Sequence, residues 1–337
     1  MIWLSLAATA VMAAITAYWF TGRIVVLLQR RQILDIPTQR SSHSTATPRG
    51  GGLAIVTVGA AAWIATSVHS GRLATDLPVM ALWLALSGLS FVDDLRGLSV
   101  TIRFLAQILA IGSAVAWLPT DQFVFQGLLP LWADRICAGL LWLWFVNLFN
   151  FMDGIDGISV VETAALGFGI ALLSPLIGLS LPDPVLAAAI AGAAIGFGVL
   201  NWPPAKVFMG DVGSIGLGFM LGWLLLLLAA AGQWLPALIL PLYYLADASV
   251  TLARRLVRFE PVWQAHRSHF YQRAALGFGN HAAVTLRVLA LNACLVGIAG
   301  LAAIAPSLGS YCLIAAGGSC ALMLWYFQRI GADADAN

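Results

Sequence analysis

Residues 135–159 read RICAGLLWLWFVNLFNFMDGIDGIS, an apolar run that ends in two aspartates, Asp153 and Asp156. Its first part, residues 135–151, is long and apolar enough for one helical crossing of a bilayer, which takes roughly 17–25 residues. An unpaired carboxylate is costly in or beside a lipid phase. The two acids therefore predict a functional site at the end of a membrane helix.

Runs of this kind recur along the whole chain of 337 residues, of which 61% are hydrophobic and 9% are charged. An ordinary soluble domain carries roughly 25% charged residues, and a β-barrel would show alternating segments of about ten residues. The composition excludes the first class, and the pattern excludes the second. We predict an all-α, polytopic integral membrane protein, with residues 1–337 forming a single transmembrane domain. Eleven spans are expected, at about 2–20, 52–68, 78–92, 102–118, 135–151, 158–179, 184–201, 213–231, 235–251, 284–304 and 309–328.

The basic residues divide fifteen to two between the two sides of these spans, with only Arg72 and Arg135 on the poorer side. Because cytoplasmic loops collect Lys and Arg, this bias predicts a periplasmic N-terminus and a cytoplasmic C-terminus. Eleven of the fifteen acids fall on the same cytoplasmic side. The expected cytoplasmic loops are about 21–51, 93–101, 152–157, 202–212 and 252–283.

The stretch FVDDLRGLSV places Asp93 and Asp94 at the inner end of the span 78–92. Neighbouring residues on a helix point in different directions, so we expect the two acids to serve different partners. Acids at a helix C-terminus also oppose the helix dipole. A functional role therefore explains this pair better than the alternative, in which both acids are only solvated at the end of a helix.

In NLFNFMDGIDG, Asn147, Asn150, Asp153 and Asp156 follow one another at steps of three residues. If the helix continues through them, they form one polar stripe of oxygen atoms, which suits Mg²⁺. The alternative is a set of polar turn residues at the membrane interface.

The stretch NWPPAKVFMGDVGSIGLGF carries Phe208 and Asp211 just before the span 213–231. A helix N-terminus attracts phosphate, and an acid there can hold a metal ion that bridges phosphates. Phe208 fits either a stacking partner for a base or an interfacial aromatic residue.

Two further loops carry cations beside histidines or glycines. HRSHFYQR, residues 266–273, offers Arg267 and His269, and arginine suits bidentate phosphate binding. Alternatively, its basic residues only reflect the general excess of positive charge in cytoplasmic loops. SSHSTATPRGGG, residues 41–52, offers His43 and Arg49 before a glycine run that could form a phosphate nest.

Asp247 lies about one turn inside the span 235–251, and Arg254, two turns further along, is its candidate partner.

Together, FVDDLRGLS, NLFNFMDGIDG, FMGDVGSIGLG and the His/Arg loop resemble the polyprenyl-phosphate N-acetylhexosamine-1-phosphate transferases, the WecA/MraY type of glycosyltransferase family 4, over about residues 35–275. The resemblance implies transfer of a sugar 1-phosphate from a UDP-sugar to undecaprenyl phosphate, with release of UMP. It implies Mg²⁺ as the cofactor, with Mn²⁺ as a substitute, and a bacterial cytoplasmic (inner) membrane enzyme whose active site faces the cytoplasm. Direct attack and a phospho-enzyme both remain open.

The same resemblance implies roles for individual residues. Asp93 and Asp94 would be the catalytic pair, and Asp211 and Asp153 would lie at the metal. The expected substrate-binding residues are Asn150, Gly154, Asp156, Phe208, Arg267 and His269, to which the glycine-rich turn adds His43 and Arg49.

The subfamily is suggested by the positions at which these motifs differ from those of other members of the family. The triple-histidine loop of the peptidoglycan MurNAc-pentapeptide enzymes is replaced by HRSH. The forms RSSHS with TPRGGG, NWPPAKVFMGD and HRSHFYQR resemble WbpL-like transferases that initiate O-antigen synthesis, a part of lipopolysaccharide biosynthesis. This implies an N-acetylated hexosamine, with 6-deoxy sugars such as FucNAc and QuiNAc as candidates.

Two other classes compete with this interpretation. A transporter or flippase of lipid-linked sugars would place its site near the bilayer midplane, whereas these acids lie at helix ends. An intramembrane prenyltransferase or a CDP-alcohol phosphotransferase would explain Asp153 and Asp156, but the DG-x-x-AR continuation of the latter is missing. No nucleic-acid partner is expected, and the sequence leaves open whether the protein forms a homodimer.

Overall fold

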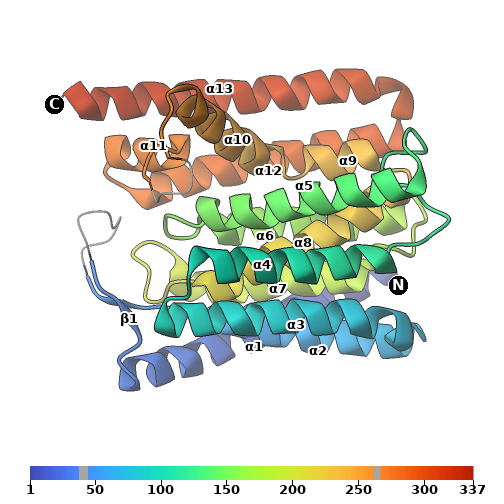
Figure 1. Cartoon of the computed structure of the whole chain (residues 1–337), viewed down its shortest axis with the longest axis horizontal. Coiled ribbons are helices and arrows are strands. Elements are labelled where there is room, and N and C mark those ends of the chain that lie inside the picture. The colour runs from blue at the N-terminus through green and yellow to red at the C-terminus, as the bar shows by residue number, and fades with distance from the viewer. Residues whose placement is uncertain (38–44, 262–265, 337) are drawn as a thin grey trace.

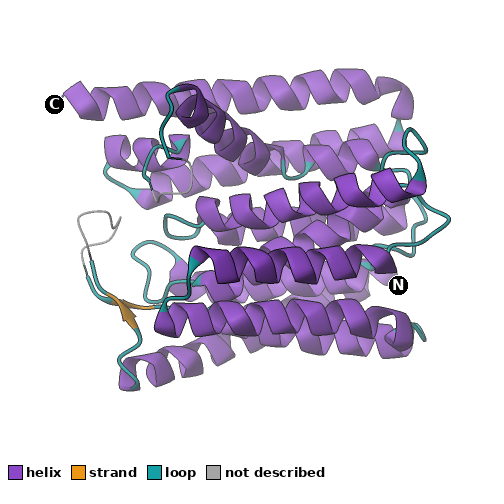
Figure 2. Ribbon diagram, viewed as in Figure 1, coloured by secondary structure: helices purple, strands orange, loops and turns teal. Residues whose placement is uncertain are grey.

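The computed structural model describes residues 1–37, 45–261 and 266–336, which form a bundle of long helices lying side by side (Figure 1). The strands β1 (Leu34–Asp35) and β2 (Thr47–Pro48) form a two-stranded sheet beside the helices, drawn in orange in Figure 2. In that pair Leu34 lies opposite Pro48 in antiparallel register. The elements are α1 (Ile2–Arg30), β1 (Leu34–Asp35), β2 (Thr47–Pro48), α2 (Leu53–His69), α3 (Leu73–Arg96), α4 (Val100–Ala114), the 3₁₀ turn η1 (Val115–Trp117), α5 (Leu131–Met152), α6 (Ile158–Leu176), α7 (Pro184–Asn201), α8 (Asp211–Ala230), α9 (Trp234–Ile239), α10 (Leu242–Val257), α11 (Phe270–Phe278), α12 (His281–Ile304), η2 (Pro306–Leu308) and α13 (Gly309–Ala336).

The helical membrane class is confirmed, although the number of candidate spans differs from the prediction. Nine helices within the described ranges are long and apolar enough to cross a membrane, against eleven expected. The span predicted at 52–68 forms α2, which has 17 residues. The span predicted at 235–251 is divided into α9 and α10, and Pro241 precedes α10. Proline lacks the N–H group that a continuous helix requires, so α10 takes its own direction across the bundle (Figure 1).

Two predicted loops are also partly helical. α1 continues to Arg30, because Thr21, Ile24 and Leu28 keep a buried face beyond residue 20. The loop predicted at 252–283 contains α11. The connections that remain irregular near the predicted site are therefore shorter than expected.

Helix α8 is the centre of the bundle, and every one of its residues is buried. Its glycines let neighbouring helices approach closely: a Cβ added at Gly218 would lie 2.9 Å from the Val146 Cα on α5. Two indole N–H groups donate to α8 carbonyls, Trp83 to Gly216 (2.8 Å) and Trp142 to Phe219 (2.9 Å). Small residues and buried hydrogen bonds are the usual means of helix association in lipid. Helix α8 thereby fixes the position of its first residue, Asp211.

The connecting segments that carry the predicted motifs gather at one end of the bundle. This end holds β1, the loops after α5 and α7, and α11, whereas the N-terminus lies at the opposite end (Figure 1). Residues from distant parts of the sequence are thus brought to one face.

Candidate active site

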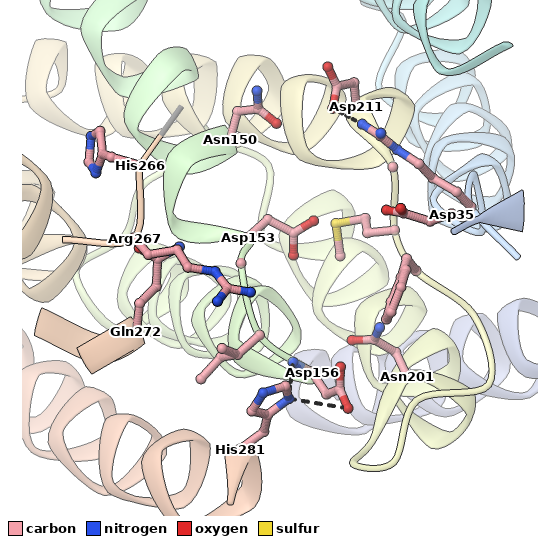
Figure 3. Close-up of a pocket in the computed structure, with 16 residues that line it drawn as sticks. Asp35, Asn150, Asp153, Asp156, Asn201, Asp211, His266, Arg267, Gln272 and His281 are labelled. Atoms are coloured by element: carbon pink, nitrogen blue, oxygen red, sulfur yellow. Dashed lines mark hydrogen bonds and ion pairs between the residues drawn. The ribbon is translucent and has the colours of Figure 1, made fainter. Parts of the chain in front are cut away.

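A cavity of about 640 Å³ lies at this end, and segments far apart in the chain form its wall (Figure 3). Eight of the twelve predicted site residues line it: Arg49, Asn150, Asp153, Gly154, Asp156, Phe208, Asp211 and Arg267. Asp93, Asp94 and His269 lie outside its lining, and His43 falls outside the described residues.

The loop 153–157 is a sharp turn between two helices and not a continued helix. α5 ends at Met152, and Gly157 has a left-handed φ of 77° at the start of α6. Glycine adopts this conformation without steric cost. The predicted polar stripe is therefore broken: Asn147 stays on α5 and donates to Gln107 (2.8 Å), while Asn150, Asp153 and Asp156 line the cavity.

Hydrogen bonds from three other segments hold this turn. The Gly157 N–H donates to Asn201 Oδ1 (2.9 Å), and the Thr285 hydroxyl donates to the Asp156 carbonyl (2.9 Å). The Asp156 carboxylate accepts from the Ala205 N–H (3.0 Å) and lies 3.4 Å from His281 Nδ1. Figure 3 shows Asp156 and His281 together at one end of the cavity. The carboxylate has a fixed orientation before any ligand binds.

The Asp94 carboxylate binds the N-terminus of α8, the helix that begins with Asp211. Its two carboxylate oxygens accept from the N–H groups of Asp211 (2.9 Å) and Val212 (3.0 Å), which begin α8. A carboxylate is favourable at a helix N-terminus because it satisfies free N–H groups and matches the helix dipole. The place predicted to attract phosphate at these amides is thus already taken by Asp94.

Two arginines join the acids into one network. Arg49 bridges Asp94 (Nε to Oδ1, 2.9 Å) and Asp211 (Nη2 to Oδ1, 2.7 Å). Arg103 bridges Asp93 (2.9 Å) and the other oxygen of Asp211 (3.3 Å). The prediction that Asp93 and Asp94 serve different partners is confirmed.

The glycine run after Arg49 serves packing and does not form an open phosphate nest. The N–H groups of Gly50 and Gly51 donate to the Phe208 carbonyl (3.1 and 2.9 Å), and that of Gly52 donates to the Met209 carbonyl (2.9 Å). A Cβ at Gly52 would lie 2.7 Å from the Gly213 nitrogen. The turn therefore lies against the start of α8, and this contact holds Arg49 beside Asp211.

Asp153 and Asp211 are the cavity residues that best fit a divalent cation. No group of three or more His, Cys, Asp or Glu suited to a metal occurs in residues 1–37, 45–261 or 266–336. Mg²⁺, however, commonly takes only one or two carboxylates together with water and substrate phosphates. Burial raises the pKa of Asp153 to about 7, and the hydrogen bond with Ser159 and the more distant Arg49 offset this only in part. A carboxyl group whose charge is so poorly compensated fits a cation.

Arg267 has donor groups that suit an anion. Its Nε and Nη2 atoms are buried and have no hydrogen-bond partner among the described residues. Its side chain extends into the cavity on the side of Asp153 (Figure 3). The neighbouring Gln272 also has a buried Oε1 without a partner among the described residues. Buried polar groups are nearly always paired, so phosphate oxygens of a ligand would satisfy Arg267, and a hydroxyl or N–H group of a ligand would satisfy Gln272.

Asp247 anchors the segment that carries Arg267, and its predicted pairing with Arg254 is wrong. The Asp247 carboxylate accepts from the backbone N–H groups of Phe270 and Tyr271 (both 3.1 Å), which begin α11, and contacts His269 Nδ1 (3.1 Å). Arg254 instead lies 4.6 Å from the centre of the Phe270 ring and contacts Gln328. His269 is thus buried against Asp247 behind the cavity.

Replacing Asp247 by alanine should destabilise the protein, because His269 and the two N–H groups would lose a buried acceptor. We expect a decrease of about 3–5 kcal/mol in the free energy of unfolding, seen as a lower Tm in detergent. The exposed Asp121→Ala at the opposite end is the control, with an unchanged Tm. An unchanged Tm for Asp247→Ala would show that α11 is held without this carboxylate.

Comparison with known proteins agrees with this geometry. The family model described as glycosyl transferase family 4 matches residues 77–229. The matched region contains Asp93, Asp94, Asp153 and Asp211, whereas Arg267 lies outside it.

The relatives carry related names. The chain is 32% identical to a decaprenyl-phosphate N-acetylglucosaminephosphotransferase of Mycobacterium leprae (strain TN) over 237 residues, which are 64% of this chain and 59% of the relative. It is 28% identical to a probable undecaprenyl-phosphate N-acetylglucosaminyl 1-phosphate transferase of Bacillus subtilis (strain 168), over 73% of this chain and 70% of the relative. A phospho-N-acetylmuramoyl-pentapeptide-transferase of Picosynechococcus sp. is 32% identical, over 64% and 62%. The chain thus spans less than two thirds of the mycobacterial relative.

The structure adds cavity residues that the sequence analysis did not select: Asp35, Ile155, Asn201, Met209, Gly210, His266, Gln272 and His281. It also adds Arg103 behind the wall, through its contact with Asp211. Asn201 ends an apolar span as Asn150 does, and this common position is a signal that could have identified it. His281 gives no comparable signal, because only the fold brings it to Asp156.

Divalent-cation binding in this cavity should strengthen as the pH rises through about 7. Below that pH Asp153 keeps a proton that a metal must displace. By the same linkage, the free energy of unfolding of the metal-free protein should fall as the pH rises towards 7, because the unfolded chain releases this proton near pH 4. Mn²⁺ titrations between pH 6 and 8 measure the first effect. Asp153→Asn should remove most of the pH dependence; an equal slope in that variant would assign it to another group.

Proposed function

We propose that this protein transfers an N-acetylhexosamine 1-phosphate from a UDP-sugar to a polyprenyl phosphate, releasing UMP. The observation that carries the proposal is that the buried Nε and Nη2 of Arg267, which have no hydrogen-bond partner among the described residues, line the same cavity as Asp153 and Asp211. A diphosphate satisfies both sides of such a cavity, because its oxygens accept from arginine and ligate a divalent cation. The names of the relatives support the same reaction.

In this reaction an oxygen of the lipid phosphate attacks the phosphorus that carries the sugar. The bond from that phosphorus to the bridging oxygen breaks, and UMP leaves with this oxygen. Arg267 would hold the diphosphate, while Phe208, Asp156 and Asn150 would bind the uridine. Direct attack and an aspartyl-phosphate intermediate both balance. Asp94 is an unfavourable nucleophile for the second route, because its side chain is fully buried and accepts two backbone N–H groups.

We propose Mg²⁺ as the cofactor, held by Asp153 and Asp211, with Mn²⁺ as a substitute. When bound, the ion would offset the negative charge of the diphosphate. The chain's own contribution is then to place Asp211 at the start of a fully buried helix and to keep Asp153 at the turn after α5.

We further propose that the acceptor is undecaprenyl phosphate in a bacterial cytoplasmic membrane and that the cavity faces the cytoplasm. The excess of basic residues on that side supports this orientation. The WbpL-like motif forms support a role in O-antigen initiation, with FucNAc and QuiNAc beside GlcNAc as candidate sugars. A transporter of lipid-linked sugars is the alternative, but the cavity lies at one end of the bundle, away from the midplane site typical of transporters.

The test is UMP release by purified protein with undecaprenyl phosphate and Mg²⁺. The donors are UDP-GlcNAc, UDP-FucNAc, UDP-QuiNAc and UDP-MurNAc-pentapeptide, each with a control lacking the lipid phosphate. UMP that requires the lipid phosphate supports the proposal, and the most active donor identifies the sugar. Folded protein that releases no UMP from any donor would contradict it and favour the transporter.

A further inference from the structure

Arg49 occupies the position of a bound cation between two acids. Its Nε atom contacts Asp94 at 2.9 Å, and its Nη2 atom contacts Asp211 at 2.7 Å. The side chain of Asp94 is fully buried and that of Asp211 is 10% exposed, whereas that of Arg49 is 38% exposed. The guanidinium therefore covers the two carboxylates from the cavity side, where Arg49 also forms part of the lining.

Both oxygens of Asp211 are ion-paired in this arrangement. Arg49 contacts Oδ1, and Arg103 contacts Oδ2 at 3.3 Å. Arg49 also interacts with the negative charge of Asp35. A divalent cation on Asp211 would lie beside two guanidinium groups that already contact both of its oxygens, so like charges would share one carboxylate. Metal binding at Asp211 thus competes with its arginines.

Arg49 can give way more easily than Arg103. Its backbone is held by the glycine contacts with Phe208 and Met209, so the side chain can move without the loop. Arg49 lines the cavity, whereas Arg103 does not and is also tied to Asp93 at 2.9 Å. A guanidinium released into this cavity would meet phosphate oxygens in the geometry that arginine binds best.

We propose that Arg49 is the resident counter-ion of Asp94 and Asp211, that a divalent cation displaces it from Asp211, and that the freed guanidinium then binds a phosphate group of a substrate. This inference rests on the proposed function. Arg49 would then pair with Asp94 and Asp211 in the ligand-free protein, and with a substrate phosphate when metal and substrate are bound.

The test measures Mn²⁺ affinity by calorimetry in the absence of both substrates. Arg49→Gln removes the competing cation, so we expect Mn²⁺ to bind about tenfold more tightly than to the unmodified protein. Transfer at saturating Mn²⁺ should nevertheless fall about 100-fold, because the phosphate loses its guanidinium. Arg96→Gln, an equal change of charge at the exposed end of the same helix as Asp94, should alter neither quantity. Unchanged or weaker Mn²⁺ binding by Arg49→Gln would overturn the inference.

Thermal stability gives a second readout. Without metal, Arg49→Gln leaves two carboxylates poorly compensated, so its Tm should fall; Mn²⁺ should raise this Tm more than that of the unmodified protein. If Arg49→Gln does not fold, Arg49→Lys serves, since lysine keeps the charge but cannot bridge both acids as a fork. Its Mn²⁺ affinity should exceed that of the unmodified protein, and equal affinity would overturn the inference. Unmodified protein that binds Mn²⁺ but releases no UMP would contradict only the proposed function.

Discussion

Asp211→Asn is expected to lower the rate of UMP release by about 10²–10³-fold, the loss typical of removing one electrostatic contact to a reacting group. Asp211 lies at the first position of a fully buried helix, lines the cavity, and is held by Arg49 and Arg103. Asparagine keeps the size of the side chain but removes the charge that would hold a divalent cation. Both arginines would also lose their shared anion.

The measurement is kcat with saturating UDP-sugar and lipid phosphate, together with Mn²⁺ affinity in the same variant. Mn²⁺ binding should weaken along with the rate, because one carboxylate is lost. Asp121→Asn, an exposed acid at the opposite end of the bundle, is the matched control and should keep normal activity. If Asp211→Asn keeps normal activity and Mn²⁺ affinity, the metal is held elsewhere.

Arg267→Gln should lower kcat/KM for the UDP-sugar by about 10²–10³-fold and leave the ligand-free protein equally stable or more stable. The sign of the stability change follows from the two buried guanidinium nitrogens, which have no hydrogen-bond partner within residues 1–37, 45–261 and 266–336. Burying unpaired donors costs free energy, so glutamine removes a cost in the free protein. In the complex it removes the bidentate contact with the diphosphate.

Two further variants distinguish bidentate binding of the diphosphate by Arg267 from an effect of its positive charge alone. Arg267→Lys keeps the charge without the planar fork, so most of the loss should remain. Arg258→Gln makes an equal change of charge at an exposed position nearby and should have little effect. A large fall in Tm for Arg267→Gln would show instead that this arginine stabilises the ligand-free fold.

Local sequence is sufficient to predict those features that depend on a single helix or a single turn. The apolar runs predict membrane helices because backbone polar groups in lipid must be satisfied within the helix. The acids Asp153 and Asp156 are predicted at a functional site for a similar reason, since an acid at the end of an apolar helix needs a nearby partner, and both line the cavity. The split of the predicted span 235–251 at Pro241 shows the limit of run length, because a single missing N–H group changes the direction of the chain.

Tertiary structure alone decided which charges meet. Sequence could place Asp93, Asp94 and Asp211 at helix ends on one side. Only the packing of α3, α4, α8 and the turn before α2 brings Arg49 and Arg103 to these acids. It likewise pairs Asp247 with the start of α11 and not with Arg254, which lies two turns away on the same helix. Hydropathy and loop charge depend on residues close in sequence, and they determined the membrane class and the site's end of the bundle. Ion pairs depend on distances of about 3 Å between atoms of different helices, which only the folded bundle defines.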